Sequence, residues 1–177
     1  MSGIAETSLA VIAPVRAEAG RDLLTALDRL GDGDQGPFAR VPGTHFGRFA
    51  FIPALTGARG EALPSEGSFL LMCADFDSPP ATWAASLCER AGEQLDSVMG
   101  HCEGFPGSGD PTAVAEYFRT HNVPPGFTVA GYRRIRVEEV REALRLQRAL
   151  GELAMRAQAE GLEGASLRAA WLEAVRG

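Results

Sequence analysis

The chain has 177 residues, of which 45% are hydrophobic and 23% charged, and its 17 basic and 23 acidic side chains give a net charge of −6. This composition fits one globular domain of ordinary size with room for an appendage. The acidic balance argues against a nucleic-acid surface, which needs clustered positive charge. No window approaches the roughly 20 apolar residues of a membrane span.

The basic residues are all arginine, which excludes a lysine Schiff base and a P-loop lysine. The N-terminus lacks the basic region of a signal peptide. The three cysteines have no CxxC spacing and lie in apolar segments. Free thiols of this kind are typical of a cytoplasmic protein.

The first half of the chain predicts three strands and two helices. An aliphatic strand over residues 7–15 precedes a helix over residues 17–30, whose apolar residues recur at helical spacing. Two strands follow over residues 44–52 and 68–76, both bounded by proline or glycine. Ser78 is the predicted N-cap of a second long helix that runs to Met99.

The second half predicts three helices and one strand. Asp110 caps a short helix that ends near His121, and residues 127–134 form a fourth strand whose alternation is less clean. Residues 137–160 are helical, with acidic side chains at the positive N-terminal end. A last helix covers residues 166–176.

This order of elements predicts an α+β fold. Four strands and two crossover helices in the order βαββαβ form the ferredoxin-like arrangement, in which a four-stranded antiparallel sheet carries both helices on one face. We therefore predict a ferredoxin-like domain over residues 1–135 and a C-terminal helical extension over residues 136–177.

Both faces of the predicted sheet are apolar, whereas an uncovered face normally alternates with polar residues. Each exposed Leu or Phe forfeits roughly 1.5–3 kcal/mol of burial, so a cover for the second face is expected. The C-terminal helices or the sheet of a second copy can supply it. Because one helix is narrower than four strands, the second sheet is favoured, and a homodimer is expected.

The element order and the two-faced strands resemble the dimeric α+β barrel superfamily, whose members pair ferredoxin-like sheets around a ligand cavity. Residues 43–49 (GTHFGRF) and 101–106 (HCEGFP) are also similar to uncharacterised bacterial proteins of that fold. Relatives by fold include cofactor-free monooxygenases of small aromatic compounds, muconolactone-isomerase-like enzymes, stress-responsive binding domains, chlorite dismutases and dye-decolourising peroxidases. The resemblance implies a dimer with a ligand cavity.

His45 and Arg48 are candidate catalytic residues in an otherwise apolar strand. His45 suits a general base or a haem ligand, and equally a strand-end histidine that bonds a backbone carbonyl. Arg48 suits a substrate carboxylate, or an ion pair with Asp75 or Asp77. Strand alternation places His45 and Arg48 on opposite faces unless a bulge at Gly47 breaks it.

His101 is the third candidate, because it lies beside Cys102 and Glu103 in a loop shaped by glycine and proline. The alternative is a capping role at the negative end of the preceding helix. No metal site is predicted, since the histidines, cysteines and acidic residues show no recognised ligand spacing.

The sequence thus predicts a dimeric α+β barrel that binds a small molecule, as a cofactor-independent oxygenase or isomerase acting on an apolar or aromatic compound. His45 would be the base and Arg48 the polar anchor, and five residues would form the apolar walls: Phe46, Phe49, Phe51, Met72 and Phe76. One alternative is a haem-binding, peroxidase-like barrel with a histidine as axial ligand (His45, His101 or His121). The other is a non-catalytic oligomerisation or partner-binding module that uses the apolar stripe of the C-terminal helices.

Overall fold

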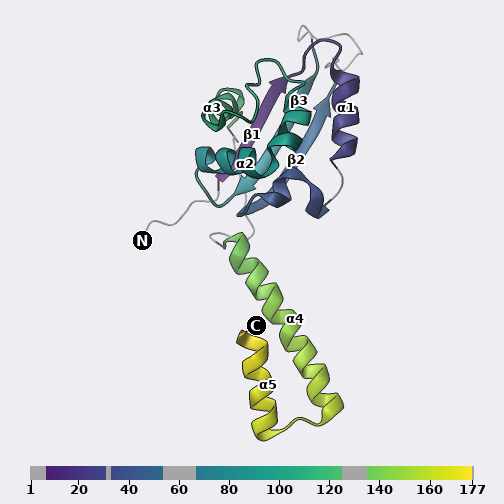
Figure 1. Cartoon of the computed structure of the whole chain (residues 1–177), viewed down its shortest axis with the longest axis vertical. Coiled ribbons are helices and arrows are strands. Elements are labelled where there is room, and N and C mark those ends of the chain that lie inside the picture. Colours follow the sequence, from purple (N-terminus) through teal and green to yellow (C-terminus); the bar gives the residue numbers. More distant parts are fainter. Residues whose placement is uncertain (1–6, 31–32, 54–66, 125–134, 177) are drawn as a thin grey trace. The chain divides into compact units, whose positions relative to one another are not determined.

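The computed structural model describes residues 7–30, 33–53, 67–124 and 135–176. The fold is α+β, and the chain divides into two compact units, Met1–Arg134 and Ile135–Gly177 (Figure 1). The elements of the first unit are β1 (Thr7–Pro14), α1 (Gly20–Arg29), η1 (Gly33–Gln35), η2 (Pro37–Arg40), β2 (Thr44–Ile52), β3 (Phe69–Phe76), α2 (Pro80–Met99) and α3 (Pro111–His121). Those of the second are α4 (Val137–Glu160) and α5 (Gly164–Arg176).

The sheet has three antiparallel strands in the order β1-β3-β2. The expected four-stranded ferredoxin-like sheet, and the dimeric α+β barrel that depended on it, are therefore wrong. The predicted fourth strand, residues 127–134, lies outside the described residues.

The outer edge of β1, where that fourth strand would pair, is occupied by other backbone. Val123 N donates to Ala10 O at 2.7 Å, and Glu103 N donates to Pro14 O at 2.8 Å. Ala10 N in turn donates to the side-chain oxygen of Asn122 at 3.0 Å. Backbone groups in the middle of β1 are thus satisfied by the end of α3, and those at its C-terminal end by the turn after α2.

The core lies between the sheet and the helices of the first unit. Alternate residues of β1 and β3 are buried, and they pack with residues of α1, α2 and α3 in one apolar cluster. Trp83 is central to this cluster, since its ring stacks on Phe76 with 4.5 Å between centroids. Its indole Nε1 donates to Thr44 Oγ1 at 3.0 Å, so the buried donor is satisfied.

The strand register defines a second face of the sheet, opposite this core. Arg48 lies across from Cys73, which in turn pairs with Ala10. The remaining residues of the second face follow by alternation and are mostly apolar: Ser8, Ile12, Pro14, Phe46, Ala50, Ile52, Phe69, Leu71 and Asp75.

Of the two N-caps predicted from the sequence, the structure confirms the one at α3 and not the one at α2. Asp110 Oδ1 accepts from Thr112 N and Ala113 N at 3.1 and 3.0 Å, which confirms the predicted N-cap of α3. Ser78 does not cap α2, because the helix begins at Pro80 with Pro79 in the N-cap position. No helix in the described part of the chain is both long and apolar enough to cross a bilayer.

The second unit is a helical hairpin of α4 and α5. Gly161 ends α4 in the left-handed conformation, with φ at 62°, which a residue with a side chain adopts only at a cost. Among the described residues 135–176, the buried apolar ones are Val137, Leu153 and Ala170.

Candidate functional site

His45 forms a close pair with Asp77 at the start of β2. The distance from His45 Nε2 to Asp77 Oδ1 is 2.7 Å, and the two side chains are 24% and 17% exposed. Asp77 N donates to Gly43 O at 2.9 Å, which anchors the chain after β3 against the start of β2. Gly43 has a φ of +75°, a backbone conformation that favours glycine at the turn into β2.

A β-bulge between Thr44 and Phe46 places His45 outside the regular register. The sequence places the expected break in alternation at Gly47. Gly47 instead pairs regularly with Ala74, and it is close to Phe38, whose ring a Cβ at this position would overlap. Because the extra residue is His45 itself, simple alternation no longer separates His45 from the second face of the sheet.

Arg48 is exposed on the second face and forms no ion pair within the described residues. Its guanidinium carbon lies 5.9 Å from the centroid of the Phe46 ring, which is within reach of a cation–π contact. Neither of the predicted ion pairs, with Asp75 or Asp77, is found.

The five predicted apolar wall residues divide between the two faces. Met72 and Phe76 are fully buried in the core, and Phe49 and Phe51 pack against it. Only Phe46, which is 47% exposed, lies on the second face beside Arg48.

His101 lies at the other end of the sheet from His45. Its carbonyl accepts from Arg16 N at 3.0 Å, just beyond the C-terminal end of β1. The strands between the two ends have eight or nine residues, which is roughly 25 Å of extended chain. The structure therefore does not bring His45 and His101 into one site.

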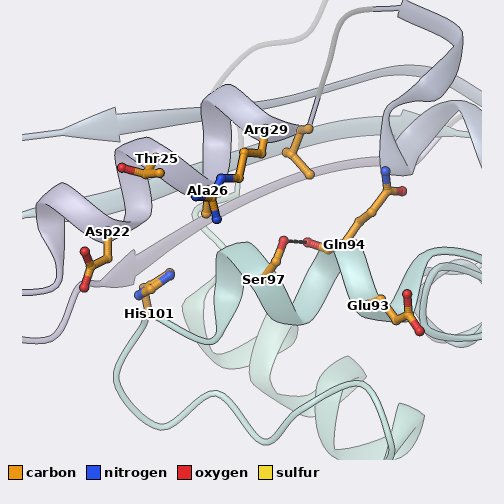
Figure 2. Close-up of a pocket in the computed structure, with 9 residues that line it drawn as sticks. Asp22, Thr25, Ala26, Arg29, Glu93, Gln94, Ser97 and His101 are labelled. Atoms are coloured by element: carbon orange, nitrogen blue, oxygen red, sulfur yellow. Dashed lines mark hydrogen bonds between the residues drawn. The ribbon is translucent and has the colours of Figure 1, made fainter.

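His101 lines a groove between α1 and α2 with a volume of about 540 Å³. Figure 2 shows Asp22 and His101 at one end of this groove, with Arg29 and Gln94 towards the other. Ser97 Oγ donates to Gln94 O at 2.8 Å, and Gln94 Nε2 donates to Gln35 O at 3.1 Å. Most of the residues that line this open groove are polar or charged, although the surface that they expose is mainly apolar.

Sequence reasoning missed two features of these sites. The sequence offers Asp77 as an ion-pair partner of Arg48, and its contact with His45 becomes visible once the end of β3 is known to lie beside the start of β2. Asp22, Thr25 and Arg29 share one side of α1 by helical spacing, but the same pattern describes any solvated helix face.

Cys102 is buried and unreactive in character. Burial raises its thiol pKa to about 12, while the nearby Arg16 guanidinium opposes the shift. Burial, followed by the charges of Cys102 and Glu103, also raises the pKa of Tyr117, whose hydroxyl donates to Glu103 O at 3.0 Å. Among the residues that the structure describes, no three metal-ligating side chains come together.

No family model, curated protein or solved structure matches this chain.

Proposed function

We propose that the protein binds a small apolar or aromatic compound with an anionic group on the second face of the sheet, and that His45 removes a proton from it. The observation that carries this proposal is the 2.7 Å contact between His45 Nε2 and Asp77 Oδ1. A carboxylate beside an imidazole fixes its orientation and stabilises the imidazolium that forms when the ring accepts a proton.

The second face supports the binding step. Ile12, Leu71 and Ala50 lie side by side across the three strands and supply an apolar floor. Arg48 lies two residues before Ala50 on the same face of β2. It has no ion pair within the described residues and offers a bidentate donor to a carboxylate. Apolar side chains combined with a few well-placed polar groups are typical of sites that bind small molecules.

The proposed chemistry needs one balanced proton transfer. With Nε2–H donating to Asp77, the Nδ1 lone pair of His45 accepts a proton from a substrate C–H, and the electron pair remains on the substrate as a delocalised carbanion. Return of the same proton to a different carbon completes an isomerisation. An oxygenase would begin with the same transfer and then combine the carbanion with O₂.

Two broader proposals accompany this one. The protein is proposed to be cytoplasmic, supported by its three free cysteines, and to have no nucleic-acid partner, supported by its net charge of −6. It is also proposed to be a homodimer, supported by the large apolar side chains that remain exposed in the described residues.

The binding step is tested with a set of small aromatic carboxylates and their neutral amides, followed by amide chemical shifts. Arg48→Ala should weaken carboxylate binding about tenfold or more, the value of one charge-assisted hydrogen bond, and leave amide binding unchanged. Arg21→Ala, a matched change at an exposed arginine of α1, should have no effect. Equal losses for both ligand types, or shifts confined to other surfaces, would show the site to be wrong.

The proton-transfer step is tested by deuterium exchange at the acidic C–H of a bound ligand. His45→Asn should abolish the exchange while the ligand still binds, and Asp77→Asn should slow it. Unchanged exchange in His45→Asn would remove the histidine from the reaction and leave only a binding function.

A further inference from the structure

We infer that the helical hairpin of α4 and α5 is the surface through which two copies of the chain associate, as a four-helix bundle. This inference rests on the homodimer proposed above and is independent of the ligand proposal. The hairpin has more apolar surface than it buries. Seven of the ten large apolar side chains that are exposed in the described residues belong to the second unit: Ile135, Val140, Leu144, Leu150, Met155, Leu167 and Trp171.

Three of these side chains share one side of the hairpin. Glu152 and Glu173 line a groove between α4 and α5. Successive residues of an α-helix are turned by about 100°, so Leu150 and Trp171, each two residues before one of these glutamates, point about 200° away from them. Leu167 lies one turn before Trp171 and shares its side. We call Leu150, Leu167 and Trp171 the apolar face of the hairpin.

The apolar face is incompletely covered within its own unit. Leu150 and Leu167 are each 38% exposed and Trp171 is 47% exposed. Two helices of this length form one layer, and a helical layer is stable when its apolar face packs on another layer. Two hairpins related by a two-fold axis bury this face against itself.

The distribution of charge along the chain favours a second copy of the hairpin as the partner of the apolar face. Residues 135–177 contain seven arginines and seven glutamates, so the whole net charge of −6 resides in the residues before them. Two hairpins therefore meet without net repulsion, whereas association through the first units brings together two bodies that carry the same negative charge. The electrostatics thus select the hairpin as the surface for self-association.

Light scattering on the full chain at micromolar concentration tests this assignment. The wild-type protein should have twice the chain mass of 18.8 kDa. Leu150→Glu should be monomeric, while Leu24→Glu, the same change at a leucine of α1 that is 45% exposed, should remain dimeric. Leu150→Ala preserves helix propensity and should raise the dimer dissociation constant about tenfold. This variant replaces Leu150→Glu in the test if the glutamate variant misfolds.

Acrylamide quenching of tryptophan fluorescence provides the second measurement. Trp83 is buried in the first unit, so quenching reports Trp171, which should be shielded in the wild-type dimer and accessible in Leu150→Glu. A wild-type dimer with a freely quenched Trp171 would keep the homodimer and overturn the hairpin interface. A wild-type monomer would overturn both, and a shielded Trp171 in that monomer would mean that the chain itself covers the apolar face.

Discussion

Cys102 shows how one buried side chain makes stability depend on pH. In the folded chain its pKa is about 12, against 9.0 for an unperturbed thiol, because burial disfavours the thiolate. Since the folded-state pKa is the higher one, the stability contributed by the neutral thiol is complete below pH 9 and is lost as the pH rises towards 12.

Cys102→Ala should therefore flatten the alkaline part of the stability profile. Between pH 9 and 11, the free energy of unfolding of the wild-type protein should fall more steeply than that of the variant, by about 1 kcal/mol per pH unit. Urea unfolding at a series of pH values measures both slopes. The raised pKa of Cys88 contributes equally to both proteins, whereas the raised pKa of Tyr117 depends in part on the charge of Cys102 and falls in the variant, which flattens its profile further. Parallel profiles would show that Cys102 ionises as easily in the folded state as in the unfolded state.

His45 and Asp77 mark the limit of what residue patterns predict. The alternation of apolar residues located β2 correctly but assumed a regular register. One extra residue at His45 changes which side chains share a face, and no residue type in this segment requires a bulge at that position. The contact with Asp77 also depends on β2 and β3 being neighbours, which is a property of the folded sheet and not of either segment.

At the scale of elements, hydrophobic period and end signals predicted most of the structure. The bounds of β2 and α4 are those expected from the sequence, and the other predicted helices and strands in the described residues differ by only a few positions at their ends. The sheet edge was not predictable in this way. Asn122 and Glu103 satisfy β1 through isolated hydrogen bonds from a helix end and a turn, and such contacts leave no periodic pattern in a sequence.

The N-cap of α3 gives an element-scale prediction. Asp110→Ala removes an acceptor from two backbone N–H groups and should lower the free energy of unfolding by about 1 kcal/mol, whereas Asp110→Asn should retain most of the stability. Urea unfolding measures the difference. The control is Asp28→Ala, which removes an exposed aspartate near the end of α1 that has no capping role. An equal loss of unfolding free energy in this control would show a general effect of removing a negative charge.

At the scale of the whole molecule, the two units differ in how much apolar surface they bury. A continuous cluster joins the sheet and helices of the first unit, whereas the hairpin buries Val137, Leu153 and Ala170. Local opening is easier where fewer apolar contacts must be broken.

Hydrogen exchange at a concentration low enough to keep the chain monomeric should reveal this difference. The amides of α4 and α5 should exchange about tenfold faster, or more, than those of β3, because opening the hairpin exposes less buried surface. Mass spectrometry of peptic fragments makes the comparison within one sample. Equal protection in the two units would indicate that they unfold as a single cooperative body.

The closed edge of β1 also has a consequence for how the chain is made. Ala10 and Asn122, which hydrogen-bond in the folded protein, are separated by 112 residues. At translation rates of about 5–20 residues per second, roughly 6 to 20 seconds pass between their synthesis. β1 therefore leaves the ribosome well before the segment that closes its edge, and its aliphatic residues remain available to a nascent-chain chaperone during that interval.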